Sequence, residues 1–167
     1  ALEFFALMNC KNPLKNEACG LCSSCRKTKI LQHELLNIIV PMPKGKSTNK
    51  YDSPLDCLTA KERQTFTDQL SIKGQVPYFK IKLEKANTII INSIKYLRKS
   101  INLSIPDNAV KLHLIFEAEK LCYPNQESAN ALLKILEEPP PNTSLILVTD
   151  KKSALLPTVI SRCQPII

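Results

Sequence analysis

The strongest constraint on the fold is a short apolar run at positions 112–116, Leu-His-Leu-Ile-Phe. Only the histidine is polar, and it counts as neutral at pH 7. A strand with this pattern has no side suited to solvent, which is typical of a central strand covered on both faces of a parallel sheet. We therefore expect this segment to form the middle of the fold.

Strands and helices alternate along the chain. A second strand is predicted over residues 35–40, where Pro41 and Pro43 end it because proline cannot donate to a ladder. A third buried strand is predicted over 145–148. Helices are predicted over 1–9, 26–32, 59–71, 89–100, 125–138 and 157–161. This alternation indicates an α/β fold with a parallel sheet.

The helix over 89–100 has an apolar stripe with spacings of four, three and four, formed by Ile90, Ile94, Leu97 and Ile101. Its opposite side carries Lys95, Arg98 and Lys99. A solvated helix back is the simpler interpretation of these cations, and a DNA-binding face is the alternative.

Local signals mark the ends of two other helices. Thr59, followed three positions later by Glu62, forms a capping box that predicts the start of a helix. The prolines at 139–141 end the helix over 125–138. Its predicted buried stripe consists of Ala129, Leu132, Leu133 and Leu136.

Composition limits the class of protein. The 167 residues, 44% of them hydrophobic, suffice for one compact core with a small appendage. The net charge of +8 favours anionic partners such as DNA or nucleotides, although the basic residues are spread along the chain. Because no run of 18 apolar residues occurs, we expect a cytoplasmic protein without membrane contact.

Four of the seven cysteines occur in the pattern C-x8-C-x2-C-x2-C, at Cys10, Cys19, Cys22 and Cys25. Four thiolates at this spacing can close a tetrahedral shell around zinc, which leaves no open position and makes the site structural. Free or partly oxidised thiols and an iron–sulfur cluster are the alternatives. Cys57 and Cys122 have no ligand-like neighbours, so we expect ordinary semi-buried thiols there.

The tetrapeptide Gly45-Lys46-Ser47-Thr48 imitates part of a phosphate-binding loop. The full motif needs a glycine five residues before Gly45, and Val40 stands at that position. We interpret this tetrapeptide as part of a polar loop over 44–57, because it lacks the backbone cradle for phosphate.

Three C-terminal stretches, KLHLIFEAEKL, ESANALLKILEEPPPNTSLILVTD and LLPTVISRCQ, fall within residues 110–166. They resemble the ATPase domain of bacterial clamp-loader subunits of the AAA+ class, the delta-prime and gamma/tau subunits of DNA polymerase III. The N-terminal ALEFFALMNC and CGLCSSC resemble the first helix and the zinc module of that family. Residues 41–88 match it only as a variable insertion.

This resemblance implies a three-layer AAA+ (RecA-like) parallel sheet over residues 1–167, with a small zinc module inserted at residues 10–25. The family has its phosphate loop just before the first helix. We therefore expect the chain to begin past that loop, as an N-terminally truncated domain.

The resemblance also assigns residues to a nucleotide site. The family places an Asp-Glu pair after the central strand, where the first acid holds magnesium and the second orients the attacking water. Phe116 and Glu117 stand at these positions, and a phenylalanine can do neither task. Glu117 is then either a site remnant or a solvent-facing acid. Thr149 matches the position that senses the terminal phosphate. Because Phe116 stands in place of the first acid, the resemblance favours delta-prime, the non-hydrolysing member.

Ser161-Arg162-Cys163 resembles the family's SRC motif, whose arginine reaches ATP on the neighbouring subunit. A planar, permanently charged guanidinium suits that task, because it can neutralise charge on phosphoryl oxygens. Without the family, Arg162 would be a helix-end cation favoured by the helix dipole. Glu137 and Glu138 have only the family pattern to explain them, because the dipole disfavours acids at a helix C-terminus.

The implied function is that of a clamp-loader subunit with little catalysis of its own. It would support ATP-driven loading of the sliding clamp onto primed DNA within the polymerase holoenzyme, a nucleotidyltransferase. The implied partners are gamma/tau, delta, the sliding clamp and primed DNA, with ATP and Mg²⁺ on the neighbouring subunit. The alternatives are an ATP-hydrolysing gamma/tau-type subunit and a zinc-dependent DNA-binding module.

Overall fold

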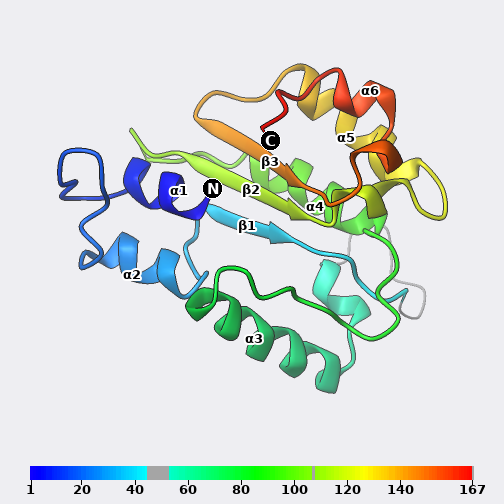
Figure 1. The fold of residues 1–167 in the computed structure, drawn as a ribbon, viewed down its shortest axis with the longest axis horizontal. Helices are drawn as coiled ribbons and strands as arrows, with labels where there is room; N and C mark the ends of the chain where they lie inside the picture. Colours follow the sequence, from blue (N-terminus) through cyan, green and yellow to red (C-terminus); the bar gives the residue numbers. More distant parts are fainter. Residues whose placement is uncertain (45–52, 107, 167) are drawn as a thin grey trace.

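The computed structural model describes residues 1–44, 53–106 and 108–166 (Figure 1). The tetrapeptide Gly45-Lys46-Ser47-Thr48 lies outside these residues. The α-helices are α1 (Leu2–Met8), α2 (Ser23–Lys29), α3 (Ala60–Gln75), α4 (Ile91–Ile101), α5 (Glu127–Glu137) and α6 (Pro157–Ile160). Strands β1 (Leu36–Ile39), β2 (Lys111–Phe116) and β3 (Thr143–Val148) and 3-10 turns η1 (Pro54–Cys57), η2 (Ala118–Cys122) and η3 (Lys152–Ala154) complete the described elements.

The three strands form one parallel sheet in the order β1-β2-β3. Leu36 lies opposite Leu112, and Lys111 lies opposite Thr143. The apolar run over 112–116 is therefore the central strand, as its composition predicted. The predicted α/β class with a parallel sheet is confirmed.

Helices cover both faces of the sheet (Figure 1). On one face, α4, α5 and α6 pack against Ile39 and Ile115, and the side chain of Ile115 is fully buried. On the other face, Phe5 of α1 packs against Leu112 and Leu114. Each fully buried isoleucine, leucine or phenylalanine stabilises the fold by roughly 1.5–3 kcal/mol. The sheet is thus the middle of three layers.

His113 is the polar residue of the central strand, and it is completely buried. Its Nδ1 lies 3.2 Å from the side-chain Nδ2 of Asn37, its register partner on β1. Its Nε2 has no hydrogen-bond partner among the described residues. Loss of solvation, together with the charge of Lys111, lowers the pKa of His113 to about 4. The ring is therefore neutral at pH 7, which allows it to lie inside an apolar strand.

The strand predicted over 145–148 is present, but the prediction that it is buried was wrong. The residues of β3 are half-buried, and Val148 is 38% exposed. Among the described residues β3 pairs only with β2, so it lies at the edge of the sheet and neighbours cover it less than they cover β2.

The predicted helix ends are partly confirmed. The capping box is present: the Thr59 N–H donates to Glu62 Oε2 (2.8 Å), and the Glu62 N–H donates to Thr59 Oγ1 (3.3 Å). Helix α2 begins at Ser23 and not at residue 26, because Cys22 Sγ accepts the Cys25 N–H and caps the helix inside the cysteine cluster. In α5, Ala129 and Leu132 of the predicted stripe are buried, but Leu133 and Leu136 are only half-buried. Ile135, which was not predicted, is buried as well.

Within the described ranges, no helix has both the length and the apolar character needed to cross a membrane.

Lys111 provides a test of this packing. Its ammonium is buried at the start of β2 and donates to the carbonyls of Ser100 (2.6 Å), Ile101 (3.3 Å) and Leu103 (2.9 Å) at the end of α4. Lys111→Met keeps an apolar stem but leaves these carbonyls without their donor. We expect it to lower the free energy of unfolding by about 1–3 kcal/mol, measured by urea denaturation. The exposed Lys134→Met is the matched control, and equal midpoints for both variants would contradict this account.

Candidate functional site

The four predicted metal ligands lie together. The Sγ atoms of Cys10, Cys19, Cys22 and Cys25 are all within 4.8 Å of one another. Cys25 Sγ is 3.6 Å from Cys10 Sγ and 4.0 Å from Cys19 Sγ. A tetrahedral zinc site with Zn–S bonds of about 2.3 Å requires S···S distances of about 3.8 Å. The four cysteines could therefore hold a metal ion.

The surrounding chain explains how these cysteines meet. Asn9, at the end of α1, donates its side-chain N–H to the Val110 carbonyl (3.0 Å) and accepts the Val110 N–H (3.0 Å), which ties the loop to the start of β2. A tight turn joins Leu14 and Glu17 by two backbone hydrogen bonds. Gly20, with φ of 70°, takes a left-handed conformation that favours glycine. The cluster is thus anchored to the sheet.

Backbone N–H groups point at the sulfurs. The Cys19 N–H donates to Cys10 Sγ (3.3 Å), and the Cys22 N–H donates to Cys19 Sγ (3.4 Å). The N–H of Cys25 lowers the pKa of Cys22 to about 6, and the N–H of Leu21 is the main cause of a lowered pKa at Cys19. Burial raises the pKa of Cys25 to about 12. These N–H groups favour thiolates, which are the form that binds a metal.

Glu117 and Thr149 follow β2 and β3, at the edge of the sheet where the carboxyl ends of parallel strands meet. Both line one cavity of about 60 Å³, which has room for a few water molecules. The structure therefore brings these two predicted residues together. The cavity is lined by Lys73, Lys80, Ile81, Phe116, Glu117, Val148, Thr149 and Asp150.

Both polar side chains already have partners in the chain. Glu117 has a left-handed backbone (φ 50°, ψ 49°), uncommon for a residue other than glycine, and forms an ion pair with Lys120 (2.8 Å). Thr149 Oγ1 donates to Glu119 Oε2 (2.6 Å) and accepts the Lys151 N–H (3.0 Å). Any ligand of this cavity would compete with these contacts.

Lys73 is a buried residue of this cavity that was not predicted from the sequence. It comes from α3, is 5% exposed, and donates to the carbonyls of Pro77 (2.9 Å) and Phe79 (2.7 Å). Its Nζ lies 4.5 Å from the centroid of the Phe116 ring, a cation–π contact. Burial lowers the pKa of Lys73. No local signal distinguishes this lysine from the solvated lysines of an exposed helix.

Arg162 lies away from the residues that line this cavity, just after α6. Its Nε and Nη2 donate to Glu137 Oε1 (2.9 and 2.5 Å), and its Nη1 donates to the Thr158 carbonyl (2.9 Å). The Arg162 side chain is 33% exposed and that of Glu137 is 47% exposed. The contact gives Glu137, at the C-terminal end of α5, a local role that the sequence did not reveal.

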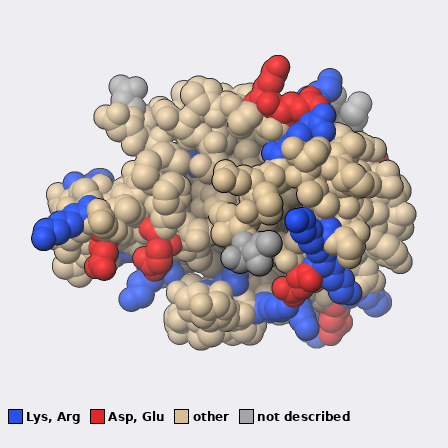
Figure 2. All heavy atoms as spheres, turned by 45° about the horizontal axis from the view of Figure 1, so that its top comes forward, with Lys and Arg blue, Asp and Glu red and all other residues tan. Residues whose placement is uncertain are grey.

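Charges of both signs are interspersed on the face shown in Figure 2. The net charge of +8 is therefore not gathered into one basic patch there. Cys57 and Cys122 are half-buried, as predicted.

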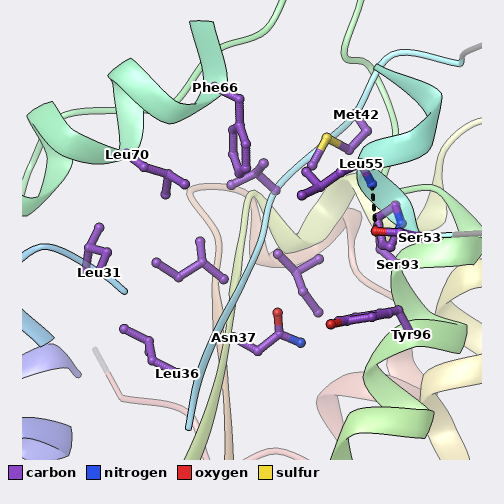
Figure 3. A pocket seen from close by; sticks show the side chains of 14 residues that line it. Leu31, Leu36, Asn37, Met42, Ser53, Leu55, Phe66, Leu70, Ser93 and Tyr96 are labelled. Carbon is purple, nitrogen blue, oxygen red and sulfur yellow. Dashed lines mark hydrogen bonds between the residues drawn. The ribbon is translucent and has the colours of Figure 1, made fainter. Parts of the chain in front are cut away.

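A larger cavity of about 230 Å³ runs along β1 between α3 and α4. Figure 3 shows Phe66 and Leu70 of α3 on one side of β1, with Asn37 and Tyr96 close together on the other. Sequence reasoning did not identify this cavity, because residues far apart in the chain line it. It shares no lining residue with the cavity at Glu117 and Thr149.

Comparisons with known proteins point to one family. A family model described as "DNA polymerase III, delta subunit" matches residues 1–167. Proteins named DNA polymerase III subunit delta' are 33% identical over 87 residues in Haemophilus influenzae and 44% identical over 54 residues in Bacillus subtilis. These matches cover 52% and 32% of this chain, but only 26% and 16% of the relatives. The matched segments thus cover about a quarter or less of the length of these relatives.

A solved structure of a DNA polymerase III gamma subunit-related protein from Thermotoga maritima is also similar. The overlay covers 82% of this chain and 42% of the Thermotoga maritima chain, with a TM-score of 0.42 and 24% sequence identity.

Proposed function

The chain belongs to the family described as DNA polymerase III, delta subunit, and from this premise we propose that it is part of a delta-prime-type clamp-loader subunit. The subunit works in the cytoplasm with gamma/tau and delta to load the sliding clamp onto primed DNA. In this proposal the chain is an AAA+ domain with a structural zinc module. The observation that carries it has two parts. The end of β2 has Phe116 where the family has a magnesium-binding acid, and the partly exposed Arg162 is not among the residues that line the cavity there.

The residues around the strand-end cavity support the proposal that this subunit hydrolyses ATP poorly. Magnesium requires oxygen ligands, and the side chain of Phe116 offers none. The buried ammonium of Lys73 lies beside the Phe116 ring and would repel a divalent cation. Glu117 remains, but its carboxylate is paired with Lys120. We infer that the subunit hydrolyses little ATP itself.

Arg162 is the group proposed to act on the neighbouring subunit's ATP. It is partly exposed, follows a short helix and carries the planar donor set that suits phosphoryl oxygens. An arginine supplied in trans can accelerate phosphoryl transfer by on the order of 10³ to 10⁵. Thr149 is proposed as the remnant of the position that senses the terminal phosphate.

The two other hypotheses have less support. An ATP-hydrolysing gamma/tau-type subunit requires a metal-binding acid where Phe116 packs against Lys73. A zinc-dependent DNA-binding module requires a concentrated basic surface, and the face shown in Figure 2 mixes both signs.

The cysteine cluster is proposed to hold one structural zinc ion. Four protein thiolates complete a tetrahedral shell, so no position remains for a reacting water. The site would fix the loop between α1 and α2, which Asn9 joins to the sheet.

One prediction of the proposed function concerns Arg162. In the assembled clamp loader, Arg162→Ala should lower ATP hydrolysis at the site that it completes by roughly 10³ or more, because a trans-acting positive charge is lost. The measurement is the ATPase rate stimulated by clamp and primed DNA, together with a circular dichroism spectrum to check folding. The exposed Arg98→Ala is the control. An unchanged rate in the Arg162→Ala complex would refute the proposal.

Another prediction of the proposed function concerns zinc. The full-length protein should contain about one zinc per chain by mass spectrometry of the metal. A chelator should remove it, lower the melting temperature and expose residues 10–25 to protease, because the described cysteines are free and no disulfide among them holds this loop. Acid should also release the metal, since its thiolate ligands must be deprotonated. Cys22→Ser should lose zinc and Cys122→Ser should keep it. Retention of zinc by Cys22→Ser would show that the ion lies elsewhere.

A further inference from the structure

We propose that Glu137 is a positioning residue for Arg162, which holds the guanidinium so that its free edge faces a phosphate on the neighbouring subunit. This inference rests on the proposed function of Arg162. It starts from a contact between two side chains 25 positions apart in sequence.

The contacts on Arg162 leave part of its donor set free. A guanidinium has five N–H donors, and the hydrogen bonds to Glu137 and the Thr158 carbonyl use three of them. One N–H on Nη1 and one on Nη2 remain without a partner among the described residues. Two adjacent nitrogens of this kind can bind phosphate oxygens in a bidentate manner. Glu137 thus holds one edge of the group and leaves another available.

Packing fixes the backbone on both sides of Arg162. Val159 of α6 is completely buried in the core cluster that includes Ala129 and Leu132 of α5, and Cys163 packs against the same cluster. The Arg162 N–H donates to the Val159 carbonyl (3.2 Å). The main chain at Arg162 is therefore held on α5, and Glu137 supplies the remaining constraint on the side chain. A preorganised arginine loses less conformational freedom when it binds an anion.

The placement of Glu137 is unfavourable unless it has this partner. It is the last residue of α5, where the negative end of the helix dipole disfavours a carboxylate. The Arg162 guanidinium offsets that repulsion. The adjacent Glu138 is exposed, and its carboxylate makes no hydrogen bond or ion pair within the described part of the chain, so it provides a matched control.

A purely structural ion pair would give a different result from a positioning residue. Both side chains are partly exposed, and pairs of this kind contribute little to stability. Glu137→Gln should therefore leave the melting temperature almost unchanged. Any effect on the assembled complex would come through the orientation of Arg162.

The test uses the full-length subunit in the reconstituted clamp loader with clamp and primed DNA. Glu137→Gln should lower kcat for ATP about 3- to 30-fold, with KM little changed, because a neutral amide oxygen holds the Arg162 guanidinium less firmly than a carboxylate does. Glu138→Gln should match the wild type. In the Arg162→Ala background, Glu137→Gln should have no further effect, because both changes act through the same group.

The outcomes separate this inference from the function on which it rests. Loss of activity in Arg162→Ala with wild-type kcat in Glu137→Gln would overturn the role of Glu137 and leave that of Arg162 intact. A further loss when Glu137→Gln is added to Arg162→Ala would also overturn it, because Glu137 would then act through another group. Full activity in Arg162→Ala would overturn both.

Discussion

The pairing of β2 with a parallel strand on each side is the constraint on which the other features depend. It buries the apolar run of the sequence between two layers of helices and sets both ends of the strand in fixed places. At the start of β2, Val110 holds Asn9 and with it the cysteine cluster. At the end of β2, Phe116 and Glu117 line one cavity together with Thr149, which follows the neighbouring strand. One buried strand therefore positions both the cysteine cluster and the strand-end cavity.

The polar side chains around the cavity at the end of β2 already have partners within the chain. Lys73 reaches the Phe116 ring from α3 and has two carbonyl partners, so its ammonium is satisfied without an anion. A buried cation in this position favours an aromatic neighbour and disfavours a divalent metal. In the proposal that Phe116 stands where the family has an acid, Lys73 is a second group that suits the aromatic side chain. This arrangement agrees with a subunit whose contribution to ATP hydrolysis lies at Arg162.

The fold was largely predictable from sequence, because hydrophobic periodicity and capping residues act locally. The run over 112–116 predicted the central strand, and Thr59 with Glu62 predicted the start of α3. The spacing of the cysteines predicted that the four sulfurs would meet. By contrast, the Lys73–Phe116 contact and the Arg162–Glu137 pair join residues far apart in the chain. Periodicity carries no information about such pairs, and it could not show that β3 lies at an edge of the described sheet.

The central claim is that this subunit lends an arginine to a neighbour and has no working magnesium site of its own. The most direct measurement is the ATP turnover of the intact polypeptide, purified away from all partner subunits, with Mg²⁺ present. We expect turnover no higher than the background of the assay, because Phe116, at the position that the resemblance gives to the metal ligand, offers no oxygen and has the buried Lys73 ammonium beside its ring. Rapid hydrolysis that follows the polypeptide through purification would contradict the account.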